Sequence, residues 1–177
     1  MRAILLWLAL SLPVHADVSA LLRPGAVALM RHATAPGTGD PPGFRVDDCS
    51  TQRNLSAAGL AEAARIGAAL RAAGVAFSDV WTSKWCRCRD TAVLPDLGPV
   101  TARPFLNSFF GDRSSRDAQT RDTLAAVAAL PPGARPIVVT HQVNITALTG
   151  IVPASGEIVV AEPDGAGGLR VTARLRL

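Results

Sequence analysis

Arginine and histidine side chains that could handle an anionic group follow two apolar runs of the chain. Arg31 and His32 come directly after the run at residues 26–30, and His141 ends the run at residues 137–141. A buried strand would deliver such residues at its carboxyl end, where open α/β sheets gather ligand-binding groups. One imidazole could attack a phosphorus atom while the other, protonated, neutralises charge on the equatorial oxygens. The pattern therefore predicts a site for a phosphoryl-like anion.

Further arginines could complete such a site, because a guanidinium makes two parallel hydrogen bonds and stays charged. Arg53 follows a long polar segment, and Arg87 lies at the start of a predicted helix. A helix that begins just beyond His141 could add backbone N–H groups. Lys84 is the only lysine, and the arginines are scattered instead of forming a basic stripe. We therefore expect an anionic small substrate and no nucleic-acid partner.

The N-terminus has the pattern of a secretory signal peptide. Arg2 is positive, residues 3–12 are apolar, and small residues precede a cleavage site after Ala16. The apolar stretch is shorter than the roughly 20 residues that a membrane span needs. We expect residues 1–16 to be a cleaved signal peptide, with periplasmic or secreted localisation and no stable membrane span after cleavage. Residues 17–177 then form one domain.

Strands and helices alternate along this domain. Strands are predicted at residues 26–30, 75–81, 100–106 and 137–141, helices at residues 18–22, 56–73, 86–94, 117–130 and from about 144, and a closing hairpin at residues 157–161 and 169–175. The pattern predicts a three-layer α/β/α sandwich with a mostly parallel central sheet. The Pro- and Gly-rich residues 35–51 follow His32 directly, so we expect a long loop over the site.

Three cysteines in an exported chain allow one disulfide. We expect Cys49 to pair with either Cys86 or Cys88, which would tie the long loop to the helix that carries Arg87. The alternative is a metal site built from Cys86, Cys88 and a histidine. The C-x-C spacing is not that of a usual zinc knuckle, so the disulfide is favoured.

Four motifs spread over nearly the whole mature chain follow the order and spacing of a known family. They are Leu-Met-Arg-His at 29–32, Asn-Leu-Ser-Ala-Ala-Gly at 54–59, Thr-Ser-Lys-Trp-Cys-Arg-Cys-Arg-Asp-Thr-Ala at 82–92 and Val-Val-Thr-His at 138–141. Together they resemble the histidine phosphatase superfamily, the phosphoglycerate mutase-like group. The resemblance implies a phosphoglycerate mutase-like fold and phosphatase chemistry that needs no metal and no cofactor.

The resemblance also implies roles for individual residues. His32 corresponds to the nucleophile that becomes phosphohistidine, Arg31 and Arg87 to the phosphate-pocket arginines, and His141 to the second pocket histidine. Arg53 would add positive charge. Further substrate contacts are implied for Thr34 and Ser50. Gln142 and Asn144 depart from the pattern, because they stand where relatives commonly have glycines, and they could either contact a substrate or cap the helix.

The proton donor departs from the pattern. A branch of the family has a glutamate acid where this chain has Ser108. Asp112 is the nearest replacement, with Asp40, Asp47 and Asp48 of the long loop as rivals. Because general-acid help is worth roughly 100- to 10,000-fold in rate, a missing donor implies a slow enzyme or a substrate with a good leaving group.

These observations predict an exported phosphomonoesterase that hydrolyses a small or glycan-linked phosphate ester. The short chain resembles exported phosphatases of the lipopolysaccharide core heptose-phosphate type more than mutases, whose glycolytic substrates are cytoplasmic. One alternative is a phosphomutase. The other is a phosphate- or phosphoglycan-binding module without an acid, which Ser108 favours.

Overall fold

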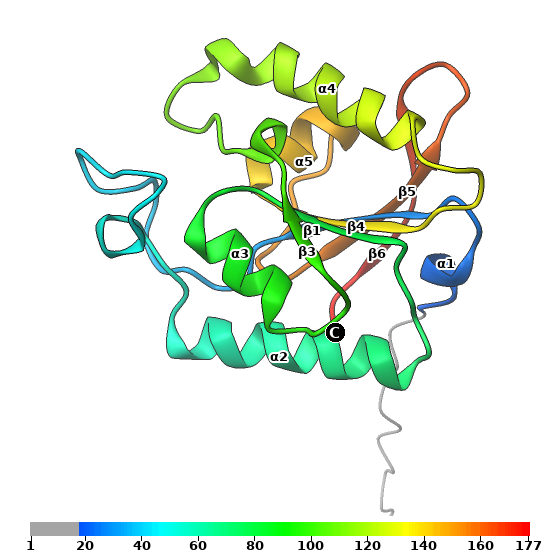
Figure 1. The fold of residues 1–177 in the computed structure, drawn as a ribbon, viewed down its shortest axis with the longest axis horizontal. Coiled ribbons are helices and arrows are strands. Elements are labelled where there is room, and N and C mark those ends of the chain that lie inside the picture. Colours follow the sequence, from blue (N-terminus) through cyan, green and yellow to red (C-terminus); the bar gives the residue numbers. More distant parts are fainter. Residues whose placement is uncertain (1–17) are drawn as a thin grey trace, which may run out of the picture.

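A six-stranded mixed sheet lies between two layers of helices in the computed structural model, which describes residues 18–177 (Figure 1). The strands are β1 (Val27–Arg31), β2 (Asp79–Thr82), β3 (Val100–Ala102), β4 (Pro136–Thr140), β5 (Ile158–Pro163) and β6 (Leu169–Leu175). The helices are α1 (Ser19–Leu22), α2 (Ala57–Ala72), α3 (Cys86–Val93), α4 (Arg116–Ala128) and α5 (Gln142–Thr149). The predicted signal peptide, residues 1–16, lies outside the described residues.

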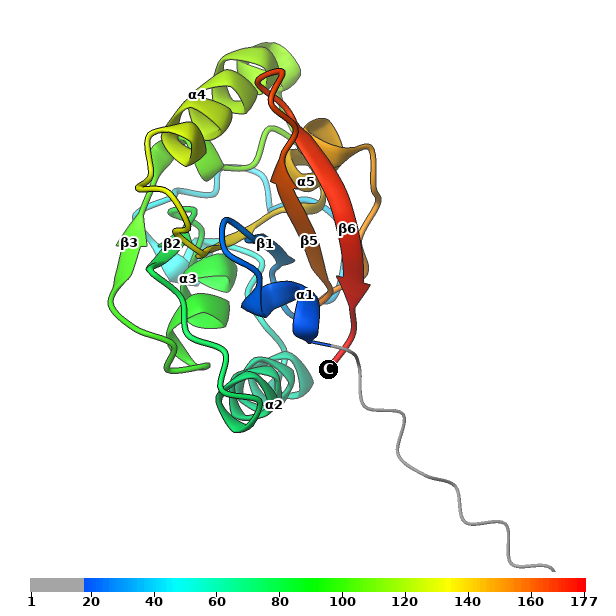
Figure 2. The ribbon, with the colours of Figure 1, turned by 90° about the vertical axis from the view of Figure 1, so that its right-hand side faces the viewer.

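The strand order is β3-β2-β4-β1-β5-β6. The first four strands of this order run parallel, whereas β5 is antiparallel to β1 and β6 is antiparallel to β5. The closing hairpin forms one side of the molecule (Figure 2). The predicted three-layer sandwich with a mostly parallel sheet is therefore confirmed.

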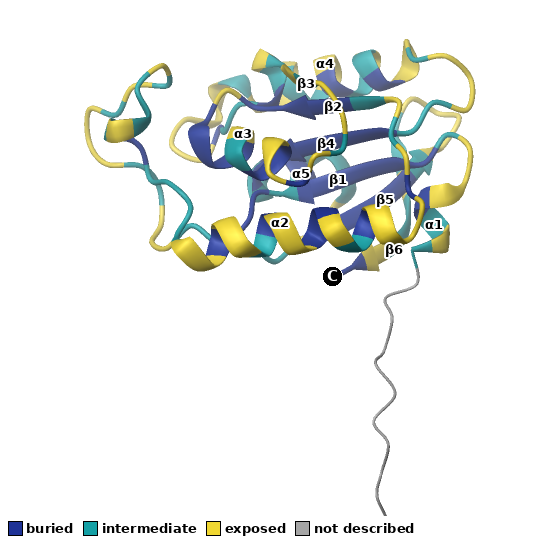
Figure 3. Cartoon of the chain, turned by 60° about the horizontal axis from the view of Figure 1, so that its bottom comes forward, coloured by how far each residue is buried: buried dark blue, intermediate teal, exposed yellow. Residues whose placement is uncertain are grey.

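Alternating residues of the central strand face the two helical layers. On β1, Ala28 and Met30 pack in the core that α1, α2 and α3 cover, and Val27 and Leu29 pack in the core that α4 and α5 cover. The inner strands β1 and β4 are buried, whereas the edge strands β3 and β6 and the outer side of α2 are partly exposed (Figure 3). Among residues 18–177, no helix is long and apolar enough to cross a membrane.

Two predicted strands are shorter than expected. The strand predicted from Val75 begins only at Asp79, because the N–H of Val75 donates to Leu70 and closes the end of α2. The strand predicted to reach Leu106 ends at Ala102 and is followed by a 3-10 turn at Pro104–Leu106. A proline has no N–H for the sheet ladder, so the strand cannot continue.

Helix α2 approaches the end of β1 very closely. Its N-cap is Ser56, whose hydroxyl accepts the N–H of Gly59 at 3.1 Å, as the sequence predicts. A Cβ added at Gly59 would lie 2.1 Å from the carbonyl oxygen of Thr34. Only glycine therefore fits at this contact, which lies two residues beyond His32.

Candidate active site

The two histidines meet because their strands are neighbours. Arg31 of β1 pairs with Thr140 of β4, and the N–H of His32 donates to the Thr140 carbonyl at 3.0 Å. The imidazole rings of His32 and His141 are 5.6 Å apart between centroids. Both residues are almost fully buried. The parallel ladder thus sets the distance between the two imidazoles before any loop contributes.

His32 has the tautomer that a nucleophile needs. Its Nδ1 lies 2.8 Å from the carbonyl oxygen of Ala33. Since a carbonyl only accepts, Nδ1 carries the proton and Nε2 keeps its lone pair. Burial, and then the charge of Arg87, lower the pKa of His32 to about 3, although the hydrogen bond to Ala33 acts in the opposite direction. The ring is therefore neutral at physiological pH.

His141 is held by donors and acceptors on both sides. Its Nδ1 lies 3.5 Å from Nη2 of Arg87, which only donates, so Nε2 carries the proton and faces Ser83 Oγ at 3.0 Å. Burial, then the charges of Arg87 and His32, lower the pKa of His141 well below its usual value. The lowered pKa favours a neutral His141 in this structure, whereas the sequence-based expectation is a protonated ring that holds a transferring phosphoryl group.

Three arginines from different elements line the same cavity. Arg31 ends β1 and donates from Nη1 to the Pro153 carbonyl at 2.9 Å. Arg87 lies in the first turn of α3, and Arg53 comes from the loop, where it donates to the Gly39 carbonyl at 2.7 Å. The Nε atoms of Arg31 and Arg87 are buried and have no hydrogen-bond partner among residues 18–177. The arrangement suits an anion with several oxygens.

The long loop adds a carboxylate that the sequence suggested only as a rival acid. Asp40 pairs with Arg87 at 2.7 Å between Oδ1 and Nη1, and both side chains are buried. Burial opposes ionisation of Asp40, but hydrogen bonds and the charge of Arg87 outweigh it and lower its pKa. Its position beside Arg87 could not be read from the sequence, where the one signal was an acidic residue in a loop that follows His32.

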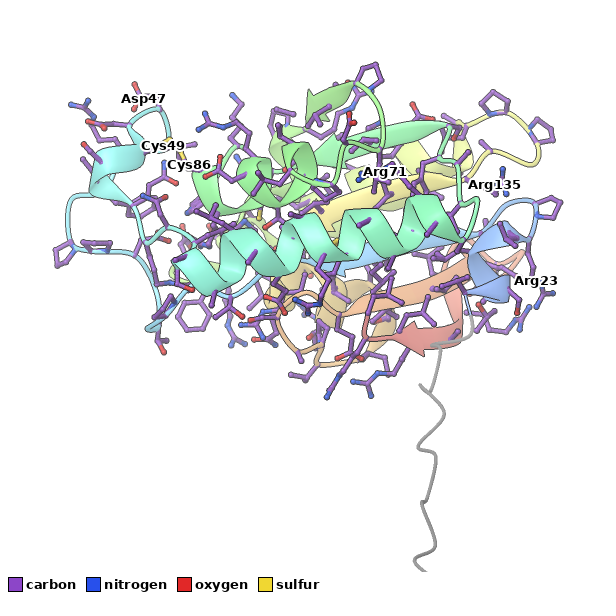
Figure 4. The ribbon with its side chains drawn as sticks, turned by 90° about the horizontal axis from the view of Figure 1, so that it is seen from below. Arg23, Asp47, Cys49, Arg71, Cys86 and Arg135 are labelled. Atoms are coloured by element: carbon purple, nitrogen blue, oxygen red, sulfur yellow. A yellow bond between two sulfur atoms is a disulfide. The ribbon has the colours of Figure 1, made fainter. Side chains whose placement is uncertain are left out.

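A disulfide joins the loop to α3. Cys49 and Cys86 are bonded, with their Cα atoms 5.7 Å apart (Figure 4). The side chain of Gln52 accepts the N–H of Cys86 at 2.9 Å beside it. Cys88 is free and buried, and burial raises the pKa of its thiol to about 12. The sequence left the partner of Cys49 open between Cys86 and Cys88, and the structure selects Cys86.

The cavity has a volume of about 660 Å³, which is in the range of pockets that hold drug-sized ligands. The histidines and arginines line it together with aromatic rings that sequence reasoning did not single out, Phe44, Trp85 and Phe110. Phe44 and Trp85 lie 5.6 Å apart between ring centroids, and Phe110 is half exposed. There is room for a leaving group well beyond the phosphoryl group.

Two further candidate residues, proposed where the chain departs from the family pattern, line the cavity together with Ser108. Gln142 lines it, and so does Asp112, which is exposed. The carboxylate of Asp112 accepts the N–H of Ser114 at 2.9 Å, and this hydrogen bond lowers its pKa. Asp112 is thus a rim carboxylate that also caps a short 3-10 turn.

The other three predicted substrate contacts do not line the cavity. Thr34 donates from Oγ1 to Glu62 at 2.8 Å. Ser50 donates to Asp48 within the loop at 2.7 Å. Asn144 is buried and donates to the carbonyl of Asn107 at 3.0 Å. These side chains support neighbouring segments.

Comparison with known proteins places the fold. No family model and no curated protein matches the chain by sequence. Among solved structures, a protein from Agrobacterium tumefaciens assigned as the phosphohistidine phosphatase SixA is 21% identical, with 86% of this chain and 97% of that chain covered and a TM-score of 0.62. A mycobacterial glucosyl-3-phosphoglycerate phosphatase is 16% identical, with 84% and 97% covered and a TM-score of 0.60. A protein histidine phosphatase SixA complexed with tungstate is 17% identical, with 85% and 96% covered and a TM-score of 0.57.

The chain therefore has the phosphoglycerate mutase-like fold of the histidine phosphatases. This agrees with the resemblance found in the four sequence motifs. At these identities the comparison places the architecture, and the chemistry is argued from the residues of the cavity.

Proposed function

We propose that the protein is a metal-independent phosphomonoesterase that works through phosphohistidine on His32. The observation that carries the proposal is the neutral His32, whose unprotonated Nε2 belongs to a cavity lined by His141 and three arginines. A neutral imidazole is a nucleophile, and fixed guanidinium groups stabilise charge on the transferring oxygens. The phosphatases with the same fold support this class of reaction.

The reaction has two displacements. First, the lone pair of His32 Nε2 forms an N–P bond while the ester P–O bond breaks, and the leaving oxygen takes up a proton. Next, water attacks the phosphorus, the N–P bond breaks with its electron pair returning to Nε2, and phosphate departs. The arginines bind the equatorial oxygens in both steps, and the incoming negative charge raises the pKa of His141 so that it can bind as imidazolium.

Asp112 is the proposed proton donor of the first step and acceptor of the second. It is the acidic side chain at the cavity rim, near Ser108. Because its pKa is lowered, its protonated form is scarce at neutral pH, which favours substrates with good leaving groups. If Asp112 is the acid, Asp112→Asn slows an alkyl phosphate more than an aryl phosphate. Equal rates on an alkyl phosphate before and after the change would remove Asp112 from the mechanism.

The phosphoenzyme itself is the test of the main proposal. The mature protein is incubated with a radiolabelled phosphomonoester, quenched, and examined for an adduct that is labile in acid and stable in base. We expect the adduct in the wild-type protein and none in His32→Ala. Absence of the adduct from the wild type would indicate a binding module, and an adduct in His32→Ala would refute the nucleophile.

The fate of the phosphoryl group separates hydrolysis from transfer. A phosphatase releases it as free phosphate, whereas a phosphomutase returns it to a bound acceptor. We propose hydrolysis of a small or glycan-linked ester. The aromatic rings of Phe44 and Phe110 would pack against the leaving group, and Gln142 could donate to its oxygens. Release of labelled phosphate in proportion to substrate consumed is the expected result.

Export is proposed together with this function. The sequence of residues 1–16 and the disulfide between Cys49 and Cys86 both support an oxidising compartment. Mass spectrometry of the protein recovered from cell fractions tests this directly. We expect a mature chain that begins at Asp17 in the periplasm or the medium, and an intact Met1 in the cytoplasm would contradict it.

A further inference from the structure

The loop between β1 and α2 sends one of its carboxylates into the protein and leaves another in solvent. The Asp40 side chain is 8% exposed, whereas that of Asp47 is 86% exposed. Figure 4 shows Asp47 at the outer end of this loop. Burying a carboxylate is costly unless it is paired and hydrogen-bonded, so the position of Asp40 calls for a specific role.

Four donors surround the Asp40 carboxylate. Oδ1 accepts from Arg87 Nη1 at 2.7 Å and from the backbone N–H of Arg53 at 3.1 Å. Oδ2 accepts from the indole Nε1 of Trp85 at 3.0 Å and from Arg87 Nη2 at 3.2 Å. A carboxylate offers about four lone-pair sites, so each site is taken. Asp40 therefore has no free lone pair with which to exchange a proton with substrate or water.

The same contacts fix the guanidinium of Arg87. Its Nη1 is shared between Asp40 and the carbonyl of Arg53, and its Nη2 lies between Asp40 and Nδ1 of His141. A two-pronged contact of this kind prevents the planar group from turning about its side chain. Nη2 is thereby held beside His141, at the wall of the cavity.

The charges of the cavity are also consistent with a role of Asp40 beside the arginines. Three arginines and two carboxylates, those of Asp40 and Asp112, line the cavity, so with neutral histidines its net charge is +1. A phosphoryl group at neutral pH carries about −1.5 to −2. Asp40 thus pairs with Arg87 and leaves the cavity with a net positive charge that suits a phosphoryl group.

We propose that Asp40 is a positioning residue that orients Arg87 for the phosphoryl oxygens. The effect of Asp40 on the reaction rate rests on the proposed function. Its effect on the orientation of Arg87 applies to any tetrahedral oxyanion that binds in the cavity. Asp40 then acts through Arg87, with no contact to the reacting atoms and no part in proton transfer.

The first test compares Asp40→Asn and Asp40→Ala with Asp47→Asn, a matched change on the exposed part of the same loop. Near-UV and far-UV circular dichroism checks that each variant is folded. We expect both Asp40 variants to lose about 10- to 100-fold in kcat/KM, since a misplaced contact of about 1 Å can cost 10²-fold. The loss should be equal for an aryl and an alkyl phosphate, and Asp47→Asn should behave as wild type. A larger loss for the alkyl ester would make Asp40 a proton donor and overturn the proposal.

The second test is a double-mutant cycle with Arg87→Ala. If Asp40 acts through Arg87, Asp40→Ala causes no further loss of kcat/KM once Arg87 is absent. An equal loss in both backgrounds would show that Asp40 acts elsewhere.

The third test measures equilibrium binding of tungstate, which needs no turnover. We expect Asp40→Ala to weaken tungstate binding, although its removal raises the positive charge of the pocket. Tighter binding would mean that Asp40 competes with the oxyanion for Arg87, and would overturn the proposal. Because this measurement does not depend on phosphohistidine, failure of the proposed function and failure of the positioning role can be told apart.

Discussion

The cavity has one half built by the sheet and another built by a loop, and they are held in different ways. His32 and His141 sit at the ends of paired, buried strands, where the ladder between β1 and β4 fixes them. The segment 35–53 is rich in proline and glycine and has exposed stretches. The disulfide from Cys49 and the contacts of Asp40 and Gln52 attach it to α3.

The difference indicates that the two histidines and the loop that helps bind the anion are held in place by separate sets of contacts. The strand ends are preorganised by the core of the domain, so changes there should remove the reaction and leave the fold. The loop depends on a few discrete bonds, so changes there should alter stability and anion binding and leave the nucleophile in place. The predictions below test this division, beginning with the largest effect.

Replacing His32 removes the proposed nucleophile at the end of β1. We expect His32→Asn to lower phosphomonoester turnover by at least about 10³-fold, because no other group in the cavity has a neutral, unprotonated nitrogen directed by a backbone carbonyl. Steady-state assays measure the loss, and circular dichroism should show an unchanged fold. Turnover within tenfold of wild type would contradict the assignment.

Replacing the disulfide loosens the loop half. The bond spans 37 residues, and we expect Cys49→Ser with Cys86→Ser to lower the free energy of unfolding by about 2–4 kcal/mol. Urea unfolding measures this difference, and phosphohistidine should still form in the folded variant. Alkylation is the control: the native protein should expose no thiol, the denatured protein one, and the reduced denatured protein three. Equal stability of variant and wild type would show that the disulfide does not hold the loop.

Acid should affect the two halves in different pH ranges. The folded-state pKa of both histidines is lowered, so as pH falls below about 6.5 the unfolded chain takes up protons that the folded protein does not, and stability is lost. For His32, whose folded-state pKa is about 3, this amounts to about 2 kcal/mol at pH 5. Asp40 also has a lowered pKa, and its contribution is lost only below about pH 4.

Denaturant unfolding at pH 7.5 and pH 5 tests the histidine contribution. Because the pKa of His141 is lowered in the folded protein, we expect His141→Asn to lose less stability than wild type between these pH values. The same pH dependence in variant and wild type would mean that His141 is protonated in the folded protein.

Helix α2 packs against the chain at Thr34, where the segment after β1 passes into the loop. A Cβ at Gly59 would overlap the Thr34 carbonyl, so Gly59→Ala should cost at least about 1–3 kcal/mol of stability. Gly111→Ala is the matched control, because a Cβ there meets nothing within 4 Å. Thermal unfolding of both variants measures the effect, and equal melting temperatures would show that the contact relaxes freely.

The sequence by itself determined the sheet half. The strands that end at Arg31, His32 and His141 could be predicted because buried strands have a local apolar pattern. Their meeting could be predicted because parallel strands present their carboxyl ends at one edge of a sheet. The cap at Ser56 and the order of strands and helices follow from equally local rules. Two strand ends were predicted wrongly. The hydrogen bond that closes α2 delays the strand predicted from Val75, and the missing N–H of Pro104 ends the strand predicted to reach Leu106.

Only the tertiary structure decided the loop half. Whether Cys86 or Cys88 bonds Cys49 depends on which face of α3 the loop meets. That Asp40 lies inside, saturated by Arg87, Trp85 and the backbone, while Asp47 stays in solvent, depends on contacts between segments far apart in the chain. The neutral state of His141 likewise comes from burial beside Arg87. Nonlocal contacts and desolvation set these features, and neither is encoded in the spacing of residues.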